Sequence, residues 1–350
     1  MHPVPSPWKS DLQRANRKLS EGETAPLSAG VRAMDLREIY KQGKEALLEK
    51  DIGVFLGGVE TEFVLHHNRR VMDQYTFRQK AIDGHPDPET TLQILGVTLA
   101  TPVIMSAMTM PIPAIVDDGL MKVARGLKRA GSLMWTGSPI PSDLAGIKKT
   151  GVALAANVKP LANREKLLRQ LDELQEAGVD WVGIEIDSGQ GTKILDKQMV
   201  FDCSPLSFKE LTSLRKAVQK PLIFKGILSA EDADKAVDAG ADGIVVSNHG
   251  AHTIDYLPHP FQVMDEIVEN VRGKTVIMVD GGFRRGSDVA KGLAFGASLV
   301  GLGRPILYGL AAHGEKGVED VVTGINGELK RILSMIGASG VRQVPRNAVL

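Results

Sequence analysis

The sequence predicts an α/β protein built on a closed (β/α)8 TIM barrel with an N-terminal helical extension. From about residue 100 onward, eight short apolar runs that end in small, polar or charged residues alternate with longer amphipathic stretches. Apolar runs without strict alternation are typical of strands buried on both faces, as parallel strands under helices are. Eight β-then-α units over about 240 residues match such a barrel in number and length. A doubly wound open sheet is the structural alternative.

The expected strands are residues 102–107, 131–137, 152–158, 181–186, 221–227, 243–248, 275–281 and 299–305. Amphipathic stretches between them predict helices, three of which begin at suitable N-caps: Asn163, Ser207 and Ser229. We therefore expect an N-terminal arm and helical extension in residues 1–90 and the barrel in residues 91–350. The arm, residues 1 to about 30, is rich in proline and has little apolar periodicity.

Composition and charge exclude several classes of function. The 350 residues include 42 Lys+Arg and 42 Asp+Glu, so the formal net charge of zero gives no broad positive field for a nucleic acid or an anionic membrane. No run approaches the roughly 18 apolar residues of a membrane span, and the N-terminus lacks the apolar stretch of a secretory signal. Cys203 has no second cysteine for a disulfide or a metal cluster. We expect a soluble, cytoplasmic protein without a metal site.

Polar and glycine residues follow the last four expected strands, at the rim where barrel enzymes carry their chemistry. The strands lead, in order, into Lys225, into Ser247–Gly250, into Asp280–Gly286 (DGGFRRG) and into Gly303-Arg304. In the third segment, glycines allow close approach to a ligand, two arginines add charge, and the helix from Ser287 onward is expected to offer free N–H groups. Together with Gly303-Arg304 this predicts an anion site, most simply for a phosphate. A plain βα turn with solvated arginines is the alternative.

His249 and Asp187 are a candidate acid–base pair. His249 follows a buried strand, so its ring is expected to project into the barrel mouth. Asp187 ends the fourth strand and could orient the imidazole and stabilise its protonated form. A structural histidine and a helix-capping aspartate are the alternatives. Lys225, at the end of an apolar strand, needs a partner anion or an electron-rich ring unless it reaches out to solvent.

The segments SNHGAHTIDYLPHP and VDGGFRRGSDVAKGLAFGASLVGLGRPILYGL resemble the signature of the FMN-dependent α-hydroxy-acid oxidases and dehydrogenases, the family of glycolate oxidase and lactate oxidase. The resemblance covers about residues 35–350. It implies FMN as the cofactor, oxidation of a small-molecule α-hydroxy acid or related alcohol, and a homo-tetramer or homo-octamer.

The resemblance also implies roles for single residues. His249 would accept a proton as a C–H bond is oxidised and flavin N5 is reduced, with Asp187 as its carboxylate partner. The implied cofactor-binding residues are Lys225 at the flavin N1/O2 edge, Ser247 at the pyrimidine side, Ser106, Ala107 and Met108 beside N5, Asn157 in place of a family glutamine, Asp280 near the ribityl chain, and Gly281, Gly282, Phe283, Arg284, Gly303 and Arg304 along the chain and phosphate.

The substrate pocket departs from the family pattern. His252 stands where a family arginine binds the substrate carboxylate, and no arginine follows Asp187. Val54 and Lys159 stand in place of two tyrosines, Glu185 in place of a threonine, and the lid segment is short. We expect a substrate that is larger than lactate, or neutral, or anchored by other groups such as His252 and Lys159. Residual carboxylate binding through His252 would strengthen below its pKa, near 6.5 for an unperturbed imidazole.

Two other classes of function stay open at this point. One is a non-redox FMN enzyme resembling the type 2 isopentenyl-diphosphate isomerases, and the other is an FMN-binding protein without turnover. The retained His249 and Asp187 favour the oxidoreductase. The sequence leaves open the substrate, the electron acceptor, and whether the electrons leave as a hydride or through a carbanion.

Overall fold

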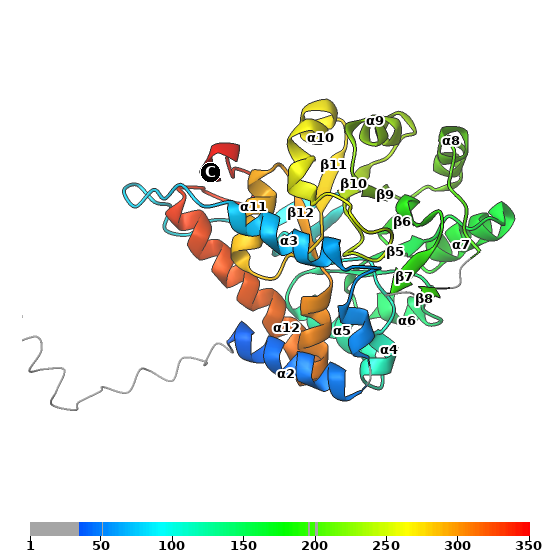
Figure 1. Ribbon diagram of the computed structural model, residues 1–350, viewed down its shortest axis with the longest axis horizontal. Coiled ribbons are helices and arrows are strands. Elements are labelled where there is room, and N and C mark those ends of the chain that lie inside the picture. The colour runs from blue at the N-terminus through cyan, green and yellow to red at the C-terminus, as the bar shows by residue number, and fades with distance from the viewer. Residues whose placement is uncertain (1–34, 51, 195–196, 200–201) are drawn as a thin grey trace, which may run out of the picture. The chain divides into compact units, whose positions relative to one another are not determined.

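The computed structural model describes residues 35–350 except 51, 195–196 and 200–201, so the predicted arm lies outside the described residues. All eight expected strands are present and form one parallel sheet in the order β3-β12-β11-β10-β9-β6-β5-β4 (Figure 1). Their bounds are β3 Val103–Met105, β4 Leu133–Thr136, β5 Ala153–Val158, β6 Trp181–Glu185, β9 Leu222–Ile227, β10 Gly243–Val246, β11 Val276–Val279 and β12 Leu299–Leu302.

The two end strands of this order lie side by side. Met108 N donates to Trp135 O at 3.1 Å, and Ser132 Oγ donates to Val103 O at 2.7 Å, so β3 meets β4. The sheet therefore curls into a barrel, which confirms the predicted TIM-barrel fold over the open-sheet alternative. Because nearly every strand residue is buried, the strands read as continuous apolar runs.

Helices follow the strands and cover the outside of the barrel (Figure 1). They are α4 (Ile112–Ile115), α5 (Gly119–Arg129), α6 (Leu144–Lys149), α7 (Arg164–Glu176), α8 (Phe208–Ala217), α9 (Ala230–Asp238), α10 (Met264–Val271), α11 (Gly286–Ala294) and α12 (Arg304–Met335). The three predicted N-caps are confirmed. Asn163, Ser207 and Ser229 each accept a hydrogen bond from a backbone N–H three residues on, which satisfies a donor that the first helical turn leaves unpaired.

The helical extension packs against the outside of the barrel. It contains α2 (Leu36–Glu49), the short 3-10 helix η1 (Gly53–Leu56) and α3 (Phe63–Gln74). Helix α2 lies along α12 (Figure 1), where the rings of Tyr40 and Tyr308 are 5.6 Å apart. The Tyr40 hydroxyl also donates to Arg284 O at 2.7 Å, so this helix reaches the loop after β11.

The described residues also form two small hairpins and the short 3-10 helices η2 (Ile186–Ser188), η3 (Pro260–Gln262) and η4 (Arg346–Ala348). The hairpin of β1 (Leu92–Ile94) and β2 (Val97–Leu99) precedes the barrel, and the Trp181 indole N–H at the start of β6 donates to Leu95 O at 2.9 Å. The hairpin of β7 (Thr192–Ile194) and β8 (Lys197–Met199) follows β6 at the opposite end of the strands. It occupies the short lid segment noted in the sequence.

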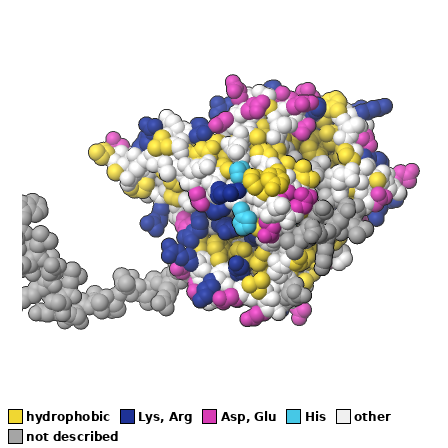
Figure 2. Space-filling model, in the orientation of Figure 1, with side chains coloured by type: hydrophobic (Ala, Val, Ile, Leu, Met, Phe, Trp, Pro, Cys, Tyr) yellow, Lys and Arg dark blue, Asp and Glu magenta, His cyan; other side chains and the backbone are white. Residues whose placement is uncertain are grey.

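The balanced net charge is not spread evenly over the surface. Lys and Arg side chains gather near the middle of the face over which α3 runs, beside exposed hydrophobic side chains (Figure 2).

None of the helices in the described part of the chain is both long enough and apolar enough to cross a membrane.

The contact between α2 and α12 generates a stability prediction. A Cβ added to Gly43 would lie 2.2 Å from Tyr308 O, so we expect Gly43→Ala to separate the two helices and to lower the free energy of unfolding by about 1–3 kcal/mol. Gly327→Ala is the control, because a Cβ there meets nothing within 4 Å in an exposed stretch of α12. It should be neutral or stabilise by about 0.5–1 kcal/mol. Equal effects in urea unfolding would contradict the close approach.

Candidate functional site

A cavity opens at the carboxyl ends of the barrel strands. Its space, counted together with the open mouth, is about 1130 Å³. Most of the residues predicted for the site line it: Ser106, Ala107, Met108, Lys159, Lys225, His249, His252, Asp280, Gly281, Gly282, Phe283, Arg284, Gly303 and Arg304. Three others, Asn157, Ser247 and Asp187, are not in its wall and contact the residues that are.

His249 and Asp187 meet at the cavity wall. His249 Nδ1 lies 2.8 Å from Asp187 Oδ2, and because a carboxylate only accepts, Nδ1 carries the proton and Nε2 keeps its lone pair. Burial raises the pKa of Asp187, but the charge of His249 when it is protonated, together with that of Lys225, outweighs burial and holds that pKa below its ordinary value. The aspartate is therefore ionised beside a histidine that can accept a proton.

The backbone around this pair is unusual on both sides. His249 has a φ of +55°, in the left-handed region that non-glycine residues seldom adopt, and its N–H donates to Ser247 Oγ at 3.0 Å. On the facing strand, Gly226 has a φ of +101°, and a Cβ there would lie 2.1 Å from Asp187 Cγ. Glycine at this position is what leaves room for the carboxylate.

Charges alternate in sign across three neighbouring strand ends. The register pairs Val158 with Ile184 and Glu185 with Lys225, so Lys159, Glu185 and Lys225 form one row. Lys159 Nζ lies 2.8 Å from Glu185 Oε2 and 3.3 Å from Ser188 Oγ, and the two charged side chains are 4% and 3% exposed. Burial raises the pKa of Glu185, but Lys159, His249 and Lys225 together lower it to about 2. Glu185, noted in the sequence only as a departure, thus lines the cavity as an anion.

Lys225 stays charged inside the barrel mouth. Burial lowers its pKa, but the carboxylates of Asp280, Asp187 and Glu185 outweigh burial and raise it. Its Nζ contacts Ser247 Oγ at 3.3 Å, and that hydroxyl in turn donates to Asp280 Oδ1. Ser247 therefore links the Lys225 cation on β9 to the Asp280 carboxylate after β11.

His252 does not behave as a titrating cation. Its Nε2 lies 3.0 Å from Gly57 O, and since a carbonyl only accepts, Nε2 carries the proton. Burial, with the charge of Arg304, lowers the pKa of His252 to about 3. Burial therefore moves any strengthening of carboxylate binding through a protonated His252 well below the expected pH of 6.5.

Arg304 ties the extension to the barrel. Its guanidinium donates to Leu56 O at 3.1 Å, Gly57 O at 2.9 Å and Gly250 O at 3.1 Å. Nη1 makes no hydrogen bond with any described residue and is available to a ligand. This clamp holds η1 over the cavity, where Phe55 lines the wall and Val54, the residue aligned with a family tyrosine, does not.

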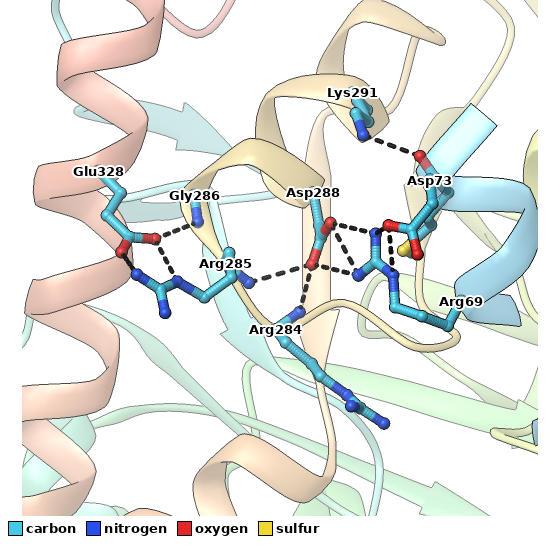
Figure 3. Close-up of polar contacts among 9 residues, drawn as sticks. Arg69, Asp73, Arg284, Arg285, Gly286, Asp288, Lys291 and Glu328 are labelled. Carbon is cyan, nitrogen blue, oxygen red and sulfur yellow. Dashed lines mark hydrogen bonds and ion pairs between the residues drawn. The ribbon is translucent and has the colours of Figure 1, made fainter. Parts of the chain in front are cut away.

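The glycine loop after β11 is built to approach a ligand. Gly281 and Gly282 have φ values of +112° and +86°, and a Cβ on Gly303 would meet nothing within 4 Å. The Arg284 guanidinium forms no ion pair within the described part of the chain, and in Figure 3 it points away from the carboxylates that surround its neighbours. Of the two arginines predicted to serve an anion, only Arg284 faces the cavity, because Arg285 is paired with Glu328.

Side chains occupy the backbone N–H groups that immediately precede Ser287 (Figure 3). The Asp288 carboxylate accepts from the N–H groups of Arg284 and Arg285 at 2.9 and 3.1 Å, and Glu328 accepts from Gly286 N at 2.8 Å. These carboxylates fix the loop from behind, so a ligand can meet only its glycine side and Arg284.

Helix α3 supports the two loops that carry His249 and Arg284. The Arg69 guanidinium donates to both oxygens of Asp288 at 3.1 Å (Figure 3). Asn68 exchanges hydrogen bonds with Asn248, at 2.6 and 3.3 Å between their side-chain atoms, and Asn248 directly precedes His249. Neighbouring residues of one helix therefore hold both loops in place, which the sequence did not reveal.

Other contributions to the site were also missed from the sequence. Thr109, Ser138 and Thr192 line the cavity, but each is an ordinary hydroxyl residue in a loop or hairpin and carries no motif. Asn157 lies behind the wall, where its Oδ1 accepts from the Trp135 indole at 2.6 Å. No three His, Cys, Asp or Glu side chains among the described residues are placed to hold a metal ion.

Comparisons with known proteins agree with this geometry. The profile of the FMN-dependent dehydrogenase family matches residues 44–197 and 190–350. A peroxisomal (S)-2-hydroxyacid oxidase of Arabidopsis thaliana is 30% identical over 90% of this chain and 96% of its own length, and an L-lactate oxidase of Lentilactobacillus hilgardii is 30% identical over 91% and 95%. A crystal structure of a mandelate oxidase variant with 2-hydroxy-phenylacetamide superposes with a TM-score of 0.81 at 28% identity, covering 88% of this chain and 95% of that one.

The buried ion pair generates a prediction about stability. Glu185→Gln removes the buried carboxylate and leaves the Lys159 ammonium in place, whereas Lys159→Met removes the ammonium and leaves the Glu185 carboxylate. Each variant should therefore lower the free energy of unfolding by about 3–5 kcal/mol at pH 7. The double variant should lose far less than the sum, because no unpaired charge remains. Urea unfolding of the four proteins checks this, and additive losses would contradict the pairing.

The ion pair of Lys159 and Glu185 should also make the stability of the protein depend on pH. The pKa of Glu185 is about 2 in the folded protein against an ordinary 4.5, so its contribution is complete above about pH 4.5 and is lost as the pH falls toward 2. The difference in stability between the wild type and Glu185→Gln should shrink over that interval. A difference that stays constant on acidification would show that the carboxylate is not ionised at neutral pH.

Proposed function

The chain belongs to the FMN-dependent dehydrogenase family, and from this premise we propose that it oxidises the alcohol carbon of an α-hydroxy acid or a related alcohol, with His249 as the base. The observation that carries the proposal is the 2.8 Å contact between His249 and Asp187 in the wall of a cavity that also holds the buried cation Lys225. A binding protein without turnover would not need a base oriented in this way.

FMN is the cofactor of this family, and the residues present fit it. The two glycines with positive φ, the open space beside Gly303 and the unpaired Arg284 suit a phosphate and its chain. Lys225, which is charged and enclosed, suits a ring that gains negative charge on reduction. In this proposal Ser106, Ala107 and Met108 contribute the wall on the opposite side.

The residues of the chain would act on the substrate as follows. Bound FMN supplies the acceptor for the two electrons of the substrate C–H bond. His249 Nε2 accepts the proton of the substrate hydroxyl, which changes the imidazole into an imidazolium. Asp187, already ionised and hydrogen-bonded to Nδ1, stabilises that positive charge and keeps the ring in one orientation. The left-handed backbone at His249, held by Ser247 Oγ, fixes the ring before substrate arrives.

We further propose a homo-tetramer or homo-octamer on the family resemblance and a cytoplasmic location on the composition. Light scattering of the purified protein tests the assembly.

Two adjacent arginines give a matched test of cofactor binding. Arg284→Ala should weaken FMN binding by about 1.5–3 kcal/mol, roughly 10- to 150-fold, because a charge-assisted phosphate contact is removed. Arg285→Ala should instead lower the free energy of unfolding, because it breaks the pair with Glu328, and should affect FMN binding less. Fluorescence titration of the apoprotein with FMN measures both, and the reverse ranking would contradict the orientation of the loop.

The base is tested by flavin reduction. His249→Ala should retain FMN and lose anaerobic flavin reduction by roughly 100- to 10,000-fold, because the proton acceptor is gone. Asp187→Asn should lose less, because the base remains while its imidazolium is less stabilised. His67→Ala, in an exposed histidine of α3 bonded to Gln262, is the control and should keep the wild-type rate. A wild-type rate in His249→Ala would remove His249 from the mechanism.

A further inference from the structure

The cavity presents hydrogen-bond acceptors where the family relies on cations. Lys159, one of the two groups expected to hold a substrate, is already bound to Glu185 Oε2 at 2.8 Å and to Ser188 Oγ at 3.3 Å. Its charge is neutralised within the wall, at 4% exposure of the side chain. A substrate carboxylate near it would also meet the Glu185 carboxylate.

His252, the other expected group, faces a ligand as an acceptor. Its Nε2–H is committed to Gly57 O at 3.0 Å, which leaves the lone pair of Nδ1 as its remaining polar group. Nδ1 makes no hydrogen bond with any residue in the described ranges. A second proton, which would turn Nδ1 into a donor, is opposed by burial and by the nearby Arg304.

The other cations that line the cavity interact with groups other than the substrate. Arg304 donates to three backbone carbonyls, and the family resemblance places it beside the cofactor phosphate. The proposed function assigns the Arg284 guanidinium to the same phosphate. Lys225 is surrounded by the carboxylates of Asp280, Asp187 and Glu185. A desolvated substrate carboxylate would therefore meet the Glu185 carboxylate and the lone pair of His252 without an uncommitted cation to balance it, which is costly.

We propose that the group beside the reacting carbon of the natural substrate is neutral and donates a hydrogen bond, as the N–H of a 2-hydroxy carboxamide does. This inference rests on the proposed oxidation of an α-hydroxy compound and names its substrate class. An amide N–H can donate to His252 Nδ1, and an uncharged group avoids repulsion from Glu185. The apolar ring of Phe55 in the same wall tolerates a neutral ligand and offers nothing to an ion.

The test compares acid and amide of the same skeleton on the FMN-loaded protein. Binding is read from the perturbation of the flavin absorbance, and turnover from anaerobic flavin reduction, with mandelate against 2-hydroxy-phenylacetamide and lactate against lactamide. We expect each amide to bind on the order of 10- to 100-fold more tightly than its acid, since one satisfied hydrogen bond replaces an unbalanced charge. Equal or tighter binding of the acids would overturn the inference.

Because ligand binding and flavin reduction are measured separately, the inference about the neutral group and the proposed oxidation can fail independently. If acids bind better and reduce the flavin, the proposed oxidation stands and the neutral-group inference falls. If amides bind better but no α-hydroxy compound reduces the flavin, the inference about recognition stands and the proposed oxidation falls.

Variants at His252 distinguish a role in substrate recognition from a purely structural role of this residue. His252→Arg should invert the preference, raising affinity for the acids and lowering it for the amides, because it introduces a permanent cation. His252→Gln, which can donate to Gly57 O and still accept a hydrogen bond, should keep the preference for amides. A purely structural role for His252 would lower both affinities together in both variants, and that result would also overturn the inference.

Discussion

The arrangement of the site depends on one buried charge, the ammonium group of Lys225 at the centre of the barrel mouth. At 2% exposure this cation cannot be balanced by water, so the surrounding strand ends must supply anions. Asp187, Asp280 and Glu185 do so, and each carboxylate then needs a partner of its own. Those partners are His249, Ser247 and Lys159. Recognition and the candidate chemistry are therefore parts of one charge-balanced network.

The second constraint is mechanical and comes from outside the barrel. Loops at strand ends are intrinsically the least restrained parts of this fold, yet here the loop that carries His249 and the glycine loop after β11 must hold an unusual backbone. Helix α3 restrains both through Asn68 and Arg69, while α2 reaches the same region through Tyr40. The helical extension thus contributes to the site although it provides few of the residues that line it. This explains why the resemblance to the family begins well before the first barrel strand.

Much of the fold could be predicted from the sequence because its signals are local. Buried parallel strands read as apolar runs, and Ser207 followed by Glu210 is a capping box visible in the sequence itself. The meeting of His249 with Asp187 was also predictable, because both follow strands whose ends share one rim. The partner of Lys159 was not, since it depends on the register of β5 against β6. The occupied start of α11 depends on Glu328, more than 40 residues away, and the tautomer of His252 depends on the carbonyl of Gly57. Each of these misses is a tertiary contact to a residue without a motif.

The central claim is that this network serves the oxidation of an alcohol carbon next to a carbonyl group. The most direct measurement is anaerobic mixing of the FMN-loaded protein with 2-hydroxy-phenylacetamide and mandelate, each carrying either hydrogen or deuterium on the hydroxyl-bearing carbon. The account predicts that the flavin absorbance is bleached and that bleaching is slower with the deuterated compound, because the C–H bond breaks in the observed step. An oxidised flavin that persists with every α-hydroxy compound, in a protein that demonstrably binds them, would contradict it.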